Sequence, residues 1–243
     1  MKKLEVIYLS RTFAVLGLLL FWTGPLYAAF FYVGPTGSDS NPGTLQRPWR
    51  TITRANQALQ PGDTVFIMNG EYRSQRIAPA NSGTPDNYIT YSAYLNDTPV
   101  LTAPPREPAF QNDRISISLV NRDYIRIIGL TVDGLAPFRD SNIDTWVLLL
   151  GAHHNIIQDS VFRRALGYHG VYLLDSSFNE ILDNSMDLVG DYDANAGEVM
   201  NLNCSNSNLV QGNTMSRGGH DVLVSNGNMN VLRENVLNNR WGP

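Results

Sequence analysis

The sequence predicts an all-β fold of stacked parallel coils, a solenoid that forms one domain over residues 29–243. Four stretches align without a gap, at steps of 24, 29 and 22 residues, and together they fill residues 145–238. In each stretch a constant apolar column runs beside a variable one, which is typical of strands with one packed face. The aligned stretches are Val147–Phe162, Val171–Met186, Met200–Met215 and Val222–Leu237.

Two columns of polar residues recur at the turns of these coils. Amide side chains stacked in successive coils can hydrogen-bond along the coil axis and satisfy turn backbone that parallel strands leave unpaired. We therefore interpret both columns as structural rather than catalytic. The first column is Asn155, Asn179, Asn208 and Asn230, and the second is Ser160, Asn184, Asn213 and Asn235.

The apolar column predicts the side chains that form the core. Cys204 falls on the same column, so we expect a core thiol there. The expected inward residues are Val147, Leu149, Val171, Leu173, Met200, Leu202, Val222 and Val224, followed by Ile157, Ile181, Val210 and Leu232.

Before the coils, the sequence predicts a short strand at residues 30–33 and a turn at 34–43. An amphipathic helix follows at 50–59, because Trp49, Ile52, Ala55 and Leu59 recur at helical spacing. Further strands are expected at residues 64–68, 88–93, 114–120 and 124–132. We see no C-terminal capping element after the last coil, and we expect a truncated chain or one that associates end to end.

Residues 1–28 have the form of a secretory signal, with Lys2, Lys3 and Arg11 before an apolar run and a cleavage point after Ala28. They hold three of the 18 basic and one of the 22 acidic side chains, which leaves a net charge of −6. This charge argues against nucleic acid as a partner. We expect a periplasmic or extracellular protein with no membrane anchor after cleavage.

The N-terminal segment also carries a resemblance. The residues Gly34-Pro35-Thr36-Gly37-Ser38, then Pro48-Trp49-Arg50-Thr51-Ile52, then Pro61-Gly62-Asp63, resemble the entry of secreted right-handed parallel β-helix proteins. Many of these proteins are polysaccharide lyases and uronate epimerases. The resemblance implies a right-handed parallel β-helix whose short N-terminal helix caps the first coil.

One column of the repeat contains ionisable side chains, unlike the apolar and asparagine columns. Thr145, His169, Glu198 and His220 each lie ten residues before the asparagine of their coil. Stacked strands are about 4.8 Å apart, so we expect Glu198 between two imidazoles. An acid/base pair, a transition-metal site and an inert polar ladder are the three interpretations.

Residues beside this column suit an acidic sugar. Arg164 and Tyr168 precede His169, while Arg217 and Asp221 flank His220. A guanidinium pairs a carboxylate bidentately, so we expect these four residues to bind substrate. Plain surface charge is the competing interpretation for each arginine.

Two further motifs are weaker. Asp191, Asp193 and Asn195 alternate oxygen ligands as a calcium loop does, although the spacing departs from the EF-hand form. A plain acidic loop is the alternative. His153 and His154 precede a turn asparagine, and we expect them to face solvent.

The coils resemble the alginate lyase and chondroitinase B group, in which a Lys is the base and an Arg assists. Glu198 matches an acid of that group, but the Lys position falls at Cys204 and the Arg position at Ser225. The chain has no lysine after Lys3, which argues against a standard Lys-based lyase mechanism. The periplasmic alginate epimerases, which use a His, remain the better analogy.

We therefore predict a protein that acts on an acidic, uronate-containing polysaccharide by His-assisted proton abstraction, centred on His169, Glu198 and His220. A non-catalytic carbohydrate-binding or cell-surface structural β-helix is the alternative. A third possibility is a glycoside hydrolase that uses Glu198 and Asp221 as its carboxylate pair.

Overall fold

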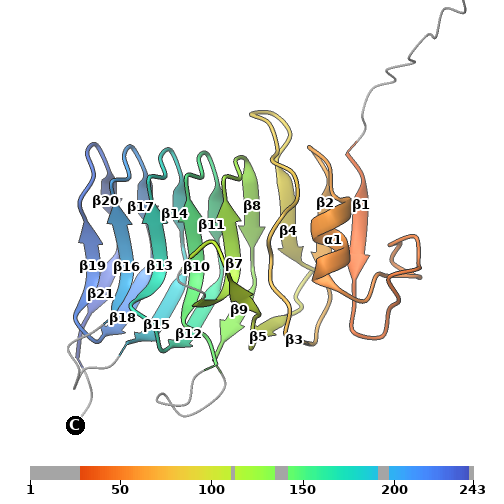
Figure 1. Cartoon of the computed structure of the whole chain (residues 1–243), viewed down its shortest axis with the longest axis horizontal. Helices are drawn as coiled ribbons and strands as arrows, with labels where there is room; N and C mark the ends of the chain where they lie inside the picture. Colours follow the sequence, from red (N-terminus) through yellow and green to blue (C-terminus); the bar gives the residue numbers. More distant parts are fainter. Residues whose placement is uncertain (1–27, 111–112, 135–141, 191–196, 241–243) are drawn as a thin grey trace, which may run out of the picture.

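The structure is a computed structural model that describes residues 28–110, 113–134, 142–190 and 197–240. The chain winds through three sheets in turn and forms a β-helix (Figure 1). The described strands pair in parallel, except that β6 is antiparallel to β7. The prediction of an all-β parallel β-helix is therefore confirmed.

Each sheet stacks one strand from each successive coil. The eight-stranded sheet contains, in order, β1 (Phe30–Val33), β2 (Thr64–Ile67), β4 (Ile89–Ala93), β8 (Ile125–Ile128), β11 (Ile156–Gln158), β14 (Glu180–Leu182), β17 (Leu209–Gln211) and β20 (Val231–Arg233). The six-stranded sheet contains β19 (Asp221–Ser225), β16 (Glu198–Asn203), β13 (His169–Leu174), β10 (Thr145–Leu150), β7 (Asp113–Val120) and β6 (Arg106–Glu107). The seven-stranded sheet contains β21 (Val236–Asn238), β18 (Thr214–Gly218), β15 (Ser185–Val189), β12 (Val161–Ala165), β9 (Thr131–Asp133), β5 (Val100–Thr102) and β3 (Glu71–Arg73).

The core lies between the three sheets. The expected inward residues of the first three coils are all fully buried. In the last coil, Leu232 and Leu237 are 42% and 51% exposed, although Val210 and Met215 one coil earlier are fully buried. No described residue covers these two side chains. End-to-end association therefore stays a prediction.

The asparagine columns form the hydrogen-bonded ladders that the sequence predicts. Asn179 Nδ2 donates to Asn208 Oδ1 at 3.1 Å and to the carbonyl of Ala152 at 3.0 Å. Its own Oδ1 accepts from the backbone nitrogen of Asn155 at 2.9 Å. Each bond of this kind contributes about 1 kcal/mol, and all of these groups are buried. The ladders therefore fix the turns on both sides of the eight-stranded sheet.

Helix α1 (Ile52–Ala58) confirms the predicted N-terminal helix. It is shorter than residues 50–59 because Thr51 is the N-cap, with its hydroxyl accepting from the nitrogen of Arg54, and Leu59 is already extended. Ile52 and Ala55 are buried against the core. Figure 1 shows the helix beside β1 and β2, where the six-stranded sheet has no strand.

Three expectations were wrong in detail. Residues 124–132 form two strands, β8 and β9, because the chain turns at Gly129, whose φ is +70°. Cys204 is exposed rather than a core thiol, because β16 ends at Asn203 and Cys204 enters the turn with a φ of +49°. Strands β3, β5 and β6 were not expected. The secretory signal expected at residues 1–28 stays a prediction, because residues 1–27 lie outside the described part of the chain. In the described part, no helix is long and apolar enough to span a bilayer.

Candidate active site

His169 and Glu198 start adjacent strands of the six-stranded sheet. They pair in register between β13 and β16, and His169 Nδ1 lies 2.6 Å from Glu198 Oε2. The two side chains are 21% and 18% exposed. An ionised carboxylate only accepts hydrogen bonds, so Nδ1 carries the proton of this contact. In neutral His169, Nε2 is then the nitrogen that can take a proton.

Packing on the outer face of the sheet holds the imidazole in place. The ring of His169 stacks on Tyr172 of the same strand, with centroids 4.1 Å apart and planes at 17°. Phe110 packs against Tyr172 at 5.5 Å, and Asn203 Nδ2 donates to the Tyr172 hydroxyl at 3.1 Å. His169 is therefore restrained by a stacked ring and by an ionic hydrogen bond.

The charge of Glu198 is favoured by its neighbours. Burial raises the pKa of Glu198, but the hydrogen bond and charge of His169, together with His220 and the amide of Asn201, outweigh it and hold the pKa below its usual range. Asn201 is 9% exposed, and its Oδ1 has no hydrogen-bond partner within the described residues.

A hollow of about 260 Å³ opens at this pair, lined by Phe110, Asp113, Tyr168, His169 and Glu198. Burial raises the pKa of Asp113 and the negative charge of Asp144 adds to it, against the opposing charges of His169, Arg106 and Arg114. The hollow thus holds one carboxyl group whose pKa is lowered and one whose pKa is raised. Such a pair suits proton transfer in both directions.

The expected register of His220 was wrong by one residue. β19 pairs Asp221, not His220, with Glu198, whereas the asparagine ladder still connects Asn208 to Asn230. The extra residue fits before β19 because Gly218 lets the carbonyl of Asp221 approach where a Cβ would collide with it.

The imidazole of His220 nevertheless lies beside Glu198. Its Nδ1 is 3.9 Å from Glu198 Oε1 and 2.8 Å from Asp221 Oδ2. The ring is 48% exposed and its closer partner is Asp221. Within the described residues, no three His, Cys, Asp or Glu side chains are grouped closely enough to hold a metal ion.

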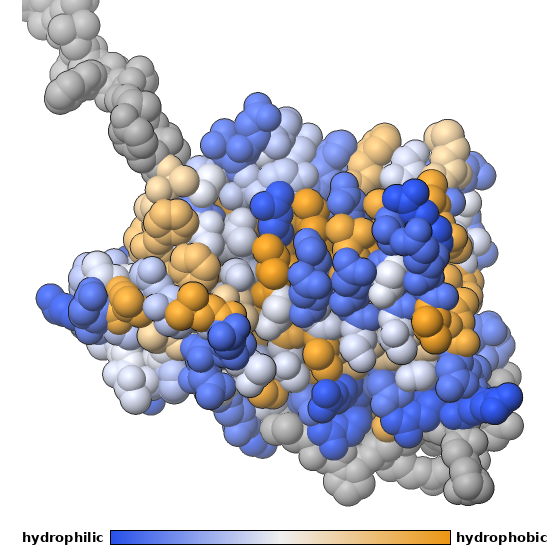
Figure 2. Space-filling model, turned by 180° about the vertical axis from the view of Figure 1, so that it is seen from behind, coloured by the Kyte–Doolittle hydropathy of each residue, from blue (hydrophilic) through white to orange (hydrophobic). Residues whose placement is uncertain are grey.

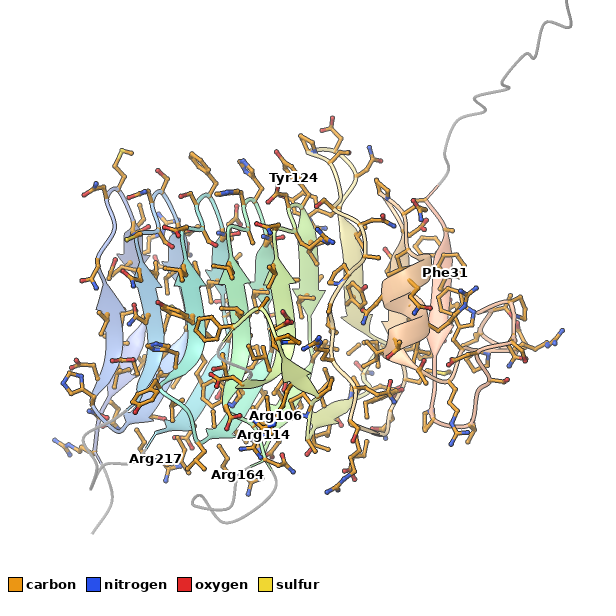
Figure 3. The ribbon with its side chains drawn as sticks, in the orientation of Figure 1. Phe31, Arg106, Arg114, Tyr124, Arg164 and Arg217 are labelled. Atoms are coloured by element: carbon orange, nitrogen blue, oxygen red, sulfur yellow. The ribbon has the colours of Figure 1, made fainter. Side chains whose placement is uncertain are left out.

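The two predicted arginines line a different hollow. Arg164 and Arg217 border a depression of about 320 Å³ on the seven-stranded sheet, together with Arg163. Arg164 forms a bidentate pair with Asp133 at 2.7 and 2.6 Å, and Arg217 forms one with Asp187. Figure 3 shows both arginines at the lower edge of the coils. The structure therefore does not bring them into the hollow of His169.

The remaining sequence motifs fall elsewhere. Asp191, Asp193 and Asn195 lie outside the described residues, so the calcium loop stays a prediction. His154 is stacked between Tyr124, at 4.8 Å, and Phe178, at 5.0 Å, so it joins an aromatic column at the turns.

Four residues of the site were not identified from the sequence. Phe110 precedes β7 and Asp113 is the first residue of β7, and both lie before the four aligned coils. Tyr172 and Asn201 lie in the variable column of the repeat, and they pair in register on β13 and β16. Of these four residues, only Tyr172 and Asn201 could have been identified from the sequence. They lie in the variable column, which is the column that faces outward from the solenoid.

Comparison with known proteins gives a family and a fold. The family described as "Pel9A-like, right handed beta helix region" matches residues 31–199. The uncharacterized protein YwoF of Bacillus subtilis (strain 168) is 30% identical over 135 residues, which are 55% of this chain and 28% of YwoF. The matched segment therefore spans less than a third of the length of that relative.

Three solved structures share the fold at low sequence identity. Pectate lyase Pel9A has a TM-score of 0.62 at 17% identity, covering 79% of this chain and 48% of its own. A rhamnogalacturonan lyase has a TM-score of 0.56 at 20% identity, covering 87% of this chain and 60% of its own. An alginate lyase from Paenibacillus sp. str. FPU-7 has a TM-score of 0.54 at 17% identity, covering 86% and 76%.

Proposed function

The chain belongs to the Pel9A-like right-handed β-helix family, and from this premise we propose that it acts on an acidic, uronate-containing polysaccharide by His-assisted proton abstraction. One observation carries the proposal. His169 Nδ1 is 2.6 Å from Glu198 Oε2, at the wall of a hollow of about 260 Å³. The three proteins of similar fold are named as lyases of pectate, rhamnogalacturonan and alginate, which supports a polysaccharide as the class of substrate.

The step begins at C5 of a uronate. Nε2 of His169 takes the C5 proton, and the electron pair passes into the sugar carboxylate as an enolate. In elimination the bond from C4 to its oxygen then breaks, and the leaving oxygen takes a proton. In epimerisation a proton returns to C5 from the opposite face. The Glu198 carboxylate stabilises the imidazolium, and general base catalysis of this kind contributes about 10²–10⁴ in rate.

The returning proton needs an acid across the hollow. Asp113 is our candidate, because burial raises its pKa and it lines the same hollow as His169. Tyr168, an exposed residue that lines the same hollow, is a second candidate. Arg106 supplies positive charge close to Asp113, which suits a substrate carboxylate.

The glycoside hydrolase alternative has one observation in its favour. Glu198 and Asp221 pair in register on β16 and β19, so two carboxylates meet on one face. Retaining glycosidases place their carboxyl groups about 5–5.5 Å apart. However, the carboxylate of Asp221 pairs with His220, and its side chain is 52% exposed. A general acid of this class usually has a buried carboxyl group.

Export completes the proposal. Removal of residues 1–28 would release the β-helix to the periplasm or the cell exterior, where polysaccharide substrates occur. Calcium at Asp191, Asp193 and Asn195 would add positive charge for an acidic sugar. Loss of activity with a chelator, restored by added calcium, tests this part separately.

The proposal is tested on a panel of uronate polymers. We expect ultraviolet absorbance from an unsaturated product, or a change in the ratio of C5 epimers, with at least one polymer. Asp113→Asn should slow the reaction, while Glu71→Gln, far along the chain on β3, serves as a matched control. Reducing ends without unsaturation would instead support the hydrolase, and binding without any product would support the non-catalytic alternative.

A further inference from the structure

The first four strands of the eight-stranded sheet carry two rows of outward side chains. Pairing places Phe30, Thr64, Thr90 and Arg126 side by side on β1, β2, β4 and β8. The second row runs from Tyr32 through Phe66, Ser92 and Ile128. Figure 2 views the molecule from behind and shows apolar surface at the end where β1 lies. These rows belong to a different sheet from His169 and Glu198.

A hollow of about 340 Å³ opens over the first row. Its walls include Thr64, Asn87, Tyr88, Thr90 and Arg126. Ligand pockets of proteins are commonly about 300–1,000 Å³ in volume. The hollow therefore has room for a small ligand such as one sugar unit, and its walls offer hydroxyl, amide and guanidinium groups together with the carboxylate of Asp86.

The guanidinium of Arg126 lies over an aromatic ring and does not pair with an acidic side chain of the described residues. Its guanidinium carbon lies 4.7 Å from the centroid of Tyr88, which packs edge-on against Tyr124 at 5.6 Å. No hydrogen bond or ion pair of the Arg126 guanidinium is found within the described residues. A guanidinium that is stacked and positioned keeps its donors for a ligand, and a carboxylate is the group that fits them bidentately.

An aromatic cluster adjoins this hollow. The ring of Phe66 lies 6.0 Å from Phe30, 5.5 Å from Tyr32 and 6.0 Å from Tyr94. Phe30 is 63% exposed although it is a large apolar side chain. Tyr32, Phe66 and Tyr94 are half-buried, so the four rings form a partly exposed apolar surface. Exposed apolar patches commonly mark binding surfaces. The C–H faces of pyranose rings are apolar and suit such a surface.

We propose that this surface is a second binding site for a uronate-containing oligosaccharide, with Arg126 as the partner of a sugar carboxylate and Phe30 and Phe66 under neighbouring rings. The choice of a carboxylated sugar rests on the proposed function. This site would bind the polymer on the eight-stranded sheet, while the reaction takes place in the hollow of His169 on the six-stranded sheet. Two linked sites of this kind raise the apparent affinity for a long chain.

Calorimetric titration with oligogalacturonate tests the site. Arg126→Gln should weaken binding at one class of site by about tenfold or more, because a charge-assisted bidentate pair is lost. Arg233→Gln, on β20 of the same sheet, is the matched control and should bind as the wild type does. Methyl-esterified oligogalacturonate, which lacks the charge, should bind the wild type and Arg126→Gln equally at this site.

The outcomes separate the two proposals. Arg126-dependent binding without turnover of any polymer would leave this site standing and remove the proposed activity. Turnover with binding that is unchanged in Arg126→Gln would overturn the site and keep the activity. Equal affinity of the wild type for the charged and the esterified oligomer would also overturn the role of Arg126. Circular dichroism of each variant confirms that it is folded.

Discussion

Nδ1 of His169 lies 2.6 Å from Oε2 of Glu198, although the two residues are 29 positions apart in the sequence. The contact exists because β13 and β16 stack in register in successive coils. It orients the imidazole, fixes which nitrogen can act as a base, and keeps the carboxylate ionised. The proposed reaction depends on this contact.

Glu198→Gln tests the contribution of the carboxylate charge. The amide keeps the size of the side chain but cannot stabilise an imidazolium as a charge does. We expect kcat to fall by about 10²-fold with little change in KM. Glu198→Asp should recover part of the rate. Equal kcat values for Glu198→Gln and the wild type would show that the contact is structural.

Asn179→Ala tests the asparagine ladder. The substitution leaves the backbone nitrogen of Asn155 and the carbonyl of Ala152 unpaired in the core. An unsatisfied buried group costs about 1–3 kcal/mol, so the free energy of unfolding should fall by at least that amount. Denaturant unfolding of Asn179→Ala is compared with Asn96→Ala, at an exposed turn, which should change it by less than about 0.5 kcal/mol. Equal stabilities would contradict the role of the ladder.

Asp144→Asn tests an ion pair next to the site. Burial raises the pKa of Asp144, but the hydrogen bonds and charge of Arg114 outweigh it and lower the pKa. A lowered pKa stabilises the fold above the unfolded value of about 3.9, and this stabilisation is lost as pH falls through the folded value. We expect the free energy of unfolding of Asp144→Asn to be about 2 kcal/mol lower than that of the wild type near neutral pH. This difference should become smaller in acid. A difference from the wild type that does not depend on pH would contradict this assignment.

Gly170→Ala tests the packing of the residue that follows His169 on β13. A Cβ at Gly170 would lie 2.6 Å from the ring of Trp146 and from the carbonyl oxygen of Val199. Overpacking of this kind costs about 1–3 kcal/mol, so thermal unfolding should occur at a lower temperature. Gly34→Ala is the control, since its Cβ would meet the flexible Sδ of Met68 at 3.0 Å and the side chain of Pro48 at an ordinary contact distance of 3.7 Å. A Gly170→Ala protein as stable as the control would contradict the packing.

The sequence predicted the parts of this molecule that repeat. The gapless alignment placed His169 against Glu198, and it identified the ladder of Asn179 and Asn208, because stacked coils turn sequence spacing into spatial register. The same reasoning was wrong by one residue at Asp221. Among the described residues, β19 pairs only with β16, and Gly218 admits an extra residue before β19.

The parts that do not repeat were out of reach. Phe110, before β7, and Asp113, the first residue of β7, line the hollow from a part of the chain that precedes the aligned coils, so the repeat does not identify them. The roles of Arg164 and Arg217 depend on Asp133 and Asp187 one coil earlier, and those pairs appear only when the outward side chains are placed. Charge alone indicated an acidic ligand but not which arginine meets it.

The most direct test of the central claim follows the C5 proton of a uronate by NMR in heavy water. Elimination and epimerisation both remove this proton, so the C5–H signal of a uronate oligomer should disappear with the wild-type protein. It should persist with His169→Asn at equal protein concentration. Persistence of the signal with the wild type on every uronate oligomer tried, or equal loss with His169→Asn, would contradict proton abstraction by His169.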